Sequence, residues 1–138
     1  MDKNRNLSPH FTLDEMQHST TAELHHVTNV APPEAVDCLR QLCLEVLEPL
    51  RQHLQAPVII NSGYRTVAYN SQLKNSSPKS QHTHGNAADI RIPGITPLAL
   101  YNFINSSYRN SLGLGLYDSF VHVDVRDGKG RWDYRSKK

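Results

Sequence analysis

The segment SQHTHGNAAD, residues 80–89, combines two histidines with an aspartate, and these side chain types can bind a transition metal. A second histidine–aspartate pair, His122 and Asp124, follows in the segment FVHVD. Catalytic zinc sites use three protein ligands from His, Cys, Asp or Glu and leave a further position for water or substrate. We therefore take His82, Asp89 and His122 as a candidate metal-binding set.

The spacing of these residues in the sequence leaves two alternatives to this set open. His84 competes with His82, and spacing alone does not choose between them. A histidine and an aspartate in a polar loop can also form a hydrogen-bonded surface pair without a metal. Cys38 and Cys43 are poor ligand candidates because both belong to an apolar helix pattern, and we expect no disulfide between them.

Two segments of alternating polarity are expected to place these residues on strands. In residues 87–92, Asp89 shares one face with an alanine and an arginine, while an alanine and two isoleucines take the other. In residues 120–126, three valines alternate with a polar face that carries His122 and Asp124. If the apolar faces pack on a core helix, the three polar side chains project together from the opposite side of the sheet.

Periodicity and capping residues predict the other elements. Thr12 and Glu15 have capping-box spacing, so residues 12–18 are expected to form a short helix. Apolar residues at three- and four-residue steps after Pro33 predict a long core helix through Leu54, which Pro49 should kink or shorten. The further expected elements are a strand at 58–61, a helix from Thr66 to Leu73, a strand at 87–92, a helix from Thr96 to Ile104 and two strands within 112–132.

Composition restricts the class of protein. The chain has 138 residues, of which 38% are hydrophobic and 20% charged, and it has no apolar run near the roughly 20 residues that span a bilayer. This predicts one soluble α+β domain over residues 1–138, with a loose segment at 1–10 and no membrane insertion. A dispersed net charge of +2 argues against nucleic acid as a partner. We expect a monomer, and the N-terminal segment as given has no secretory signal pattern.

Five residues of the opening segment follow the pattern S-x-H-x-x-G-x-A-x-D, and they are Ser80, His82, Gly85, Ala87 and Asp89. This pattern resembles the signature of the M15 zinc peptidases, the D-alanyl-D-alanine carboxypeptidase-like family that cuts peptidoglycan peptides. The segments SGYR at 62–65 and FVHVD at 120–124 are similar to further segments of that family and follow in its order. The HFTLDEM segment and the long helix are similar to its small single-domain members, so the resemblance covers nearly the whole chain.

The resemblance implies a hedgehog/D-Ala-D-Ala peptidase-like fold, in which a small antiparallel sheet carries the zinc site and helices pack on its opposite face. It makes His82, Asp89 and His122 the ligands of one Zn²⁺ ion and so favours His82 over His84. Arg65 and Ser80 fall where the family contacts its substrate. A guanidinium suits a peptide carboxylate because it forms two parallel charge-assisted hydrogen bonds.

The sequence departs from the family pattern at the general base. Many M15 enzymes have an acidic residue three positions before the last histidine, where this chain has Ser119. Asp124 is the first candidate base, because its H-x-D pattern is similar to a subgroup of the family and it lies about 7 Å along the strand from His122. Asp118 is the second candidate, if a bend brings it to the metal. Asp124 could instead orient a ligand histidine.

The resulting expectation is a zinc metallopeptidase that hydrolyses peptidoglycan stem or cross-link peptides through metal-activated water, as a carboxypeptidase or an endopeptidase. It would act on the bacterial cell wall, reached through the periplasm or by phage-type release. The alternatives are a non-catalytic zinc-bearing domain that binds the cell wall or a protein, and a structural domain without a metal.

Overall fold

The computed structural model describes residues 6–17, 29, 31–64, 85–109, 111–126 and 128–136. The helix predicted from Thr66 lies outside these residues. The described elements are, in order, β1 (Asn6–Ser8), β2 (Phe11–Thr12), α1 (Leu13–Gln17), α3 (Pro33–Leu42), the π-helical turn η1 (Cys43–Leu47), α4 (Glu48–Leu54), β3 (Ile59–Ser62), β4 (Ala87–Arg91), α6 (Pro97–Ser107), β5 (Leu112–Leu116), β6 (Val121–Asp124) and β7 (Lys129–Asp133).

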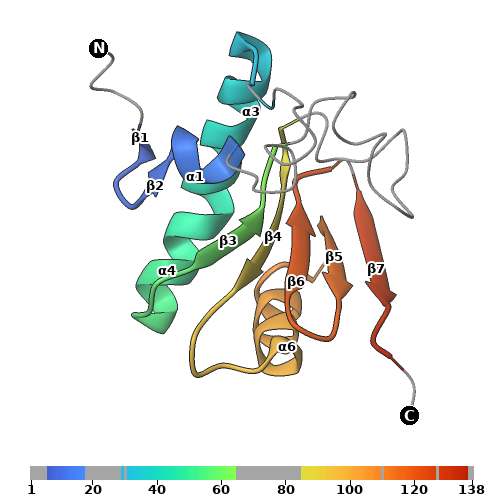
Figure 1. The fold of residues 1–138 in the computed structure, drawn as a ribbon. Coiled ribbons are helices and arrows are strands. Elements are labelled where there is room, and N and C mark those ends of the chain that lie inside the picture. The colour runs from blue at the N-terminus through green and yellow to red at the C-terminus, as the bar shows by residue number, and fades with distance from the viewer. Residues whose placement is uncertain are drawn as a thin grey trace.

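Five strands form one sheet in the order β3-β4-β6-β5-β7 (Figure 1). The first four strands pair antiparallel, whereas β7 runs parallel to β5. The predicted α+β class is confirmed, but the prediction of an antiparallel sheet with two strands in 112–132 is wrong, because the structure has three strands there. β7 escaped detection because its sequence, KGRWD, contains one large apolar side chain and so has no apolar alternation.

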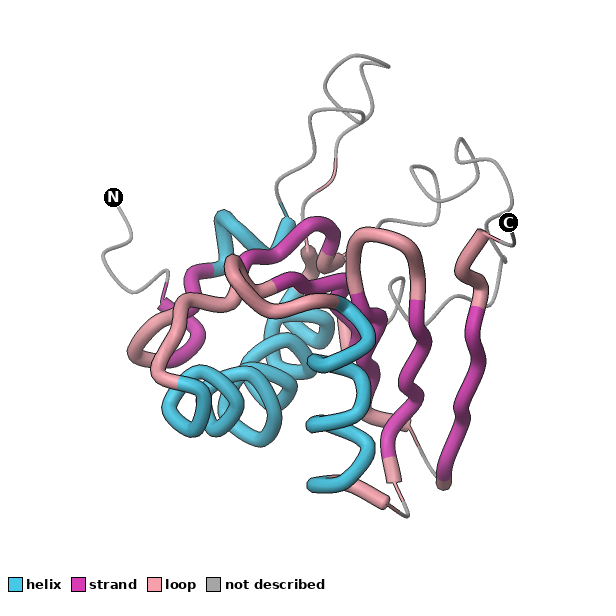
Figure 2. The backbone as a smooth tube through the Cα atoms, turned by 90° about the horizontal axis from the view of Figure 1, so that it is seen from below, coloured by secondary structure: helices cyan, strands magenta, loops and turns pink. Residues whose placement is uncertain are grey.

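Helices pack on one face of this sheet, which Figure 2 shows from below. Val121 and Val123 point to that face and are fully buried, as are Ala88 and Ile90 on β4. They share a core with apolar residues of α3, η1 and α6. The predicted apolar faces of both strands are therefore confirmed. None of the helices in the described parts of the chain has the length and apolar character needed to cross a bilayer.

The long core helix continues past Pro49 to Leu54, so the proline does not shorten it. A π-helical turn precedes the proline, and the backbone N–H of Glu48 bonds to the carbonyl of Cys43. Pro49 has no N–H to offer the carbonyl of Glu45, four residues earlier. That carbonyl instead accepts the Tyr108 hydroxyl, at 2.9 Å. A contact with the segment after α6 thus replaces the lost helical hydrogen bond.

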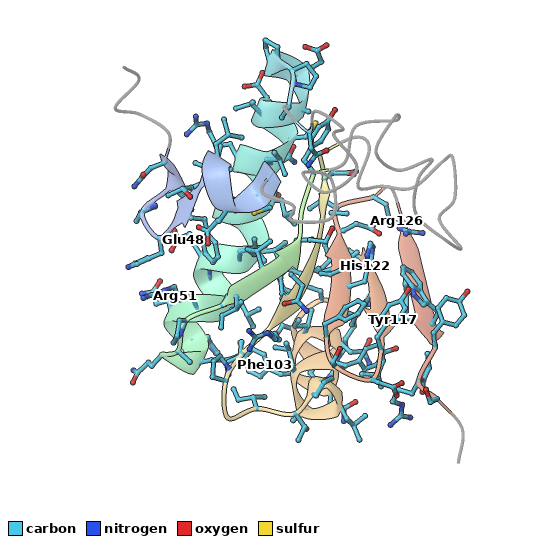
Figure 3. All side chains as sticks on the ribbon, viewed as in Figure 1. Glu48, Arg51, Phe103, Tyr117, His122 and Arg126 are labelled. Atoms are coloured by element: carbon cyan, nitrogen blue, oxygen red, sulfur yellow. The ribbon has the colours of Figure 1, made fainter. Side chains whose placement is uncertain are left out.

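Side-chain hydrogen bonds anchor the ends of several elements. The Glu15 carboxylate accepts the Thr12 N–H at 2.7 Å, and the Thr12 hydroxyl accepts the Glu15 N–H at 3.2 Å, so the predicted capping box is confirmed. Thr96 caps α6 by accepting the Ala99 N–H at 3.1 Å. On α4, Glu48 holds the turn between β1 and β2, on a side of the molecule away from His122 (Figure 3).

Candidate metal centre

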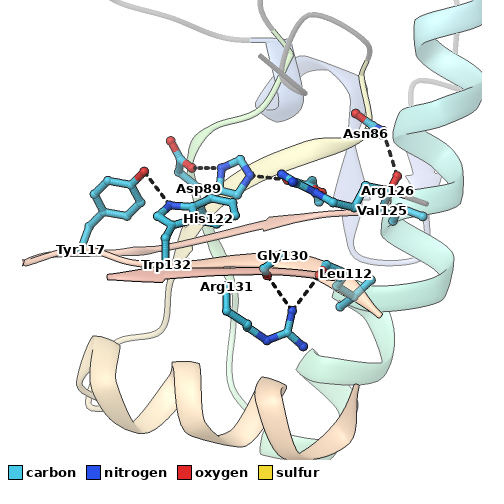
Figure 4. A network of polar contacts seen from close by, with 11 residues as sticks. Asn86, Asp89, Leu112, Tyr117, His122, Val125, Arg126, Gly130, Arg131 and Trp132 are labelled. Atoms are coloured by element: carbon cyan, nitrogen blue, oxygen red, sulfur yellow. Dashed lines mark hydrogen bonds and ion pairs between the residues drawn. The ribbon is translucent and has the colours of Figure 1, made fainter. Parts of the chain in front are cut away.

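Asp89 on β4 and His122 on β6 lie directly opposite each other in the antiparallel register. Directly opposed residues project from the same face of a sheet. The Asp89 Oδ1 atom is accordingly 3.0 Å from His122 Nδ1, and each residue is 8% exposed. Figure 4 shows the pair on one side of the strands, with α6 on the other. The prediction that these side chains project together, away from the helices, is confirmed.

The second ring nitrogen of His122 contacts a second carboxylate. His122 Nε2 lies 2.7 Å from Asp124 Oδ2. Arg126 then donates to both oxygens of Asp124, from Nε to Oδ1 and from Nη2 to Oδ2, each at 2.6 Å. Asp89, His122, Asp124 and Arg126 thus form a continuous line of polar contacts, named here the polar row (Figure 4).

Burial and charge act against each other in the polar row. Burial alone would raise the pKa of Asp124, but the hydrogen bonds from Arg126 and His122 hold this pKa at about 2. Burial alone would lower the pKa of His122, whereas contact with the carboxylates of Asp124 and Asp89 raises it overall. A buried carboxylate next to a guanidinium is favoured in its charged form. Asp124 is therefore ionised at neutral pH.

The glycines of β5 make room for this arrangement. Gly113 lies opposite Asp124, and a Cβ atom placed on it would collide with the carboxylate and with the Arg126 guanidinium. A Cβ atom on Gly115, opposite His122, would collide with the indole of Trp132. The alternating LGLGL sequence thus has leucines on the core face and space on the polar face. This repeat was the available sequence signal for crowding at the site.

Trp132, which no sequence pattern marks as part of a site, forms one wall of the site. Its ring centre lies 5.2 Å from that of His122, and the Arg126 guanidinium carbon lies 5.2 Å from the centre of the Trp132 ring. The indole N–H donates to the Tyr117 hydroxyl at 3.0 Å. Arg126 lies two residues after Asp124, on the face that the alternation predicts for His122 and Asp124, but no sequence pattern indicated a role for it at the site.

The described half of the site fits a zinc ion by its donor types. A ring nitrogen and a carboxylate oxygen lie side by side at Asp89 and His122, and zinc accepts both kinds of ligand. A zinc-bound histidine almost always donates its other N–H to a carboxylate or carbonyl, and Asp124 occupies that position. Asp89 and Asp124 contact different nitrogens of one ring. Among the described residues, no three potential ligands group around one point.

The remaining predicted site residues fall into two groups. His82, Ser80 and Arg65 lie outside the described residues. Asp118, the second candidate base, is exposed in the turn between β5 and β6, where its carboxylate accepts the N–H of Ser136 at 2.9 Å and its O–H at 2.5 Å. The structure therefore brings Asp89, His122 and Asp124 together and places Asp118 at a hairpin turn.

Gly85 is the first described residue of the segment that leads into β4. Its φ of +81° is in the left-handed region, and a Cβ atom there would lie 2.6 Å from the Ala35 carbonyl oxygen. Any other residue would be strained and would collide with the start of α3. The turn conformation predicted for Gly85 itself is confirmed.

Comparison with known proteins gives two findings. The model of the family described as Peptidase M15 matches residues 9–124, which include the polar row up to Asp124. The peptidoglycan L,D-endopeptidase MepK of Escherichia coli (strain K12) is 38% identical over 76 residues, which cover 50% of this chain and 40% of that protein. MepK of Escherichia coli O157:H7 and of Shigella flexneri match to the same extent. The chain thus spans less than half the length of these curated relatives.

Proposed function

Because the chain belongs to the Peptidase M15 family, we propose that it is a zinc-dependent peptidase that hydrolyses peptide bonds of peptidoglycan. The observation that carries this proposal is the pairing of Asp89 with His122 across β4 and β6, inside the family match. A zinc ion held there would lower the pKa of its bound water to about 7 and polarise the scissile carbonyl.

We assign the zinc ion to His82, Asp89 and His122. The 3.0 Å separation of Asp89 Oδ1 and His122 Nδ1 supports two of these ligands, because it leaves both atoms directed at one region. The left-handed conformation of Gly85 is compatible with His82 as the third, because such a conformation lets a chain turn just before β4. Trp132 flanks the His122 ring.

The substrate side of the proposal concerns Arg65 and Ser80. Stem peptides carry carboxylates, and a guanidinium binds a carboxylate through two parallel hydrogen bonds. We propose that Arg65 binds such a group and that Ser80 contacts the peptide near the metal. The activity in the relatives' name, L,D-endopeptidase, favours an internal peptide bond over a carboxypeptidase reaction.

The contacts of the two candidate bases bear on their roles. Both oxygens of Asp124 accept hydrogen bonds from Arg126, and the residue is fully buried, so it is poorly placed to take a proton from an attacking water. Asp118 is held by Ser136 in an exposed turn. These contacts favour a structural role for each carboxylate over direct proton transfer to or from the substrate.

Digestion of purified peptidoglycan tests the proposal directly. The zinc-loaded protein is incubated with sacculi of different stem-peptide chemistry, and the fragments are analysed by mass spectrometry. We expect new amino and carboxyl termini within the peptides, and none with protein stripped of metal by a chelator. Intact stem peptides from every wall type, at full zinc occupancy, would refute the peptidase.

A non-catalytic zinc-bearing binding domain is the second candidate function, and Ser119 favours it. This residue replaces the acid that many M15 enzymes have three positions before the last histidine. Such a domain would co-sediment with insoluble peptidoglycan in the presence of zinc and release no fragments. Release of fragments in the digestion would exclude it.

A further inference from the structure

We propose that Asp124 and Arg126 are positioning residues for His122, which select the ring nitrogen that a metal can bind. The proposal rests on the zinc site described above and adds to it the residues that orient one ligand. Asp124 selects Nδ1 by holding the proton on Nε2, and Arg126 holds Asp124 in place.

The selection follows from the hydrogen-bonding capacity of each group. Both oxygens of Asp124 accept from Arg126, and an ionised carboxylate has no proton to donate. Since Asp124 Oδ2 lies 2.7 Å from His122 Nε2, we assign the proton of that contact to Nε2. Nδ1 also contacts a carboxylate oxygen, that of Asp89, but at 3.0 Å this contact is longer than the 2.7 Å contact of Nε2 with Asp124. A neutral imidazole carries one proton, so the shorter contact assigns the proton to Nε2 and the lone pair to Nδ1, on the side of Asp89. A metal binds the nitrogen that has no proton.

Arg126 makes this arrangement possible in a buried position. Asp124 is fully buried, and a charge in such a place is stable only when it is paired and hydrogen-bonded. The guanidinium fork fixes the plane of the carboxylate as well as its charge. Arg126 itself lies against the Trp132 ring and passes over Gly113 and Gly130, where a Cβ atom would crowd it. Gly113, Gly130 and Trp132 therefore determine where the Arg126 guanidinium lies.

The chain contains a matched control for this pair. Asp133 and Arg135 have the same spacing and the same two-pronged contact, with Nη2 to Oδ2 at 2.7 Å. Their side chains are 47% and 45% exposed, and neither contacts His122 in any described hydrogen bond or ion pair. Asp124→Asn and Arg126→Gln are therefore compared with Asp133→Asn and Arg135→Gln.

Two measurements test the proposal. Nitrogen-15 chemical shifts of the His122 ring, in metal-free protein at slightly alkaline pH, report which nitrogen carries the proton. Competition with a chromophoric chelator gives the zinc affinity. We expect wild type to be protonated at Nε2, and Asp124→Asn and Arg126→Gln to show a mixture of tautomers with zinc affinity lowered about 10- to 100-fold. The control variants should match wild type in both measurements.

Three outcomes would overturn the proposal. One is a wild-type ring protonated at Nδ1, which needs no variant. Another is unchanged tautomer and zinc affinity in both Asp124→Asn and Arg126→Gln. The third is a loss of hydrolysis in Asp124→Asn that persists at saturating zinc while the affinity is unchanged, since that is the signature of a general base. If Asp124→Asn fails to fold, Arg126→Gln and Arg126→Lys decide the matter, with Lys expected to restore only part of the affinity.

Failure of the proposed function would be recognised separately. A wild type that shows the Nε2 tautomer but hydrolyses no peptidoglycan would refute the peptidase and leave the positioning role supported. A wild type that hydrolyses peptidoglycan with the opposite tautomer would do the reverse.

Discussion

Asp89 and His122, 33 residues apart in the chain, face each other across neighbouring strands with Asp89 Oδ1 3.0 Å from His122 Nδ1. The antiparallel register of β4 and β6 creates this contact, and the buried valines and isoleucine of the same strands fix the register. A shift of one residue would move either side chain to the helix face. The hydrophobic core thus determines the position of the site.

Removing either half of this pair should abolish metal binding. We expect Asp89→Ala and His122→Gln to lose stoichiometric zinc and peptidoglycan hydrolysis together, because each removes one of three proposed ligands. Metal analysis of purified protein and fragment analysis provide the readouts. His53→Gln is the control, since His53 is exposed and packs against Phe103 of α6. Zinc retained at full occupancy in both ligand variants would place the metal elsewhere.

Gly113→Ala should damage the site through crowding alone. The added methyl group collides with Asp124 and Arg126, so we expect zinc affinity to fall and the free energy of unfolding to drop by about 1–3 kcal/mol. Gly94→Ala serves as the comparison, because nothing lies within 4 Å of a Cβ there, although its φ is +85°. That variant should cost about 1–2 kcal/mol and leave zinc affinity unchanged. Equal zinc affinities for the two variants would contradict the crowding argument.

Arg131 should be a main contributor to stability on the helix face. Its guanidinium donates to the side chain of Asn105 on α6 and to the backbone carbonyls of Leu112, the first residue of β5, and of Tyr108, just after α6. We expect Arg131→Gln to lower the free energy of unfolding by at least about 2 kcal/mol, because several charge-assisted bonds are lost at once. Urea denaturation measures this. Arg109→Gln, at an exposed position, should change stability by less than about 0.5 kcal/mol.

Glu48 should make stability depend on pH. Burial alone would raise the pKa of its carboxyl, but hydrogen bonds from Ser8 and His10 lower it overall below the ordinary value of 4.5. A lowered pKa in the folded state means that the stabilisation is present above about pH 4.5 and is lost as the pH falls through the lowered pKa.

We therefore expect Glu48→Gln to unfold with a lower free energy than wild type by about 1 kcal/mol at neutral pH. The difference should begin to shrink below about pH 4.5 and disappear once the pH has fallen through the lowered pKa of Glu48. Urea denaturation at a series of pH values tests this, with Glu45→Gln, an exposed position one turn earlier, as the control. A difference between wild type and Glu48→Gln that stays constant down to strongly acidic pH would show that charge is not its source.

Local patterns in the sequence were sufficient for much of the fold and for part of the site. The strand faces of Asp89, His122 and Asp124 follow from alternation with period two, and the caps at Thr12 and Thr96 follow from short-range hydrogen bonds. The resemblance to M15 peptidases, based on ordered motifs, is confirmed by the family match. Each of these depends on residues close in sequence or on a known pattern.

Tertiary structure alone decided the features that depend on distant contacts. The parallel strand β7 brings Trp132 beside His122, and neither its strand nor its direction is visible in the KGRWD sequence. The helix continues through Pro49 because Tyr108, far along the chain, satisfies the Glu45 carbonyl.

The arrangement around Asp124 is the clearest case. The sequence by itself determined that Asp124 would lie beside His122 on one strand face, because the spacing of side chains along a strand is a local property. Only the folded sheet decided which atoms of these residues meet. In the folded sheet the Arg126 guanidinium donates to both oxygens of Asp124, and both groups lie against Gly113, which has no Cβ atom to collide with them. Such contacts across strands depend on register and packing.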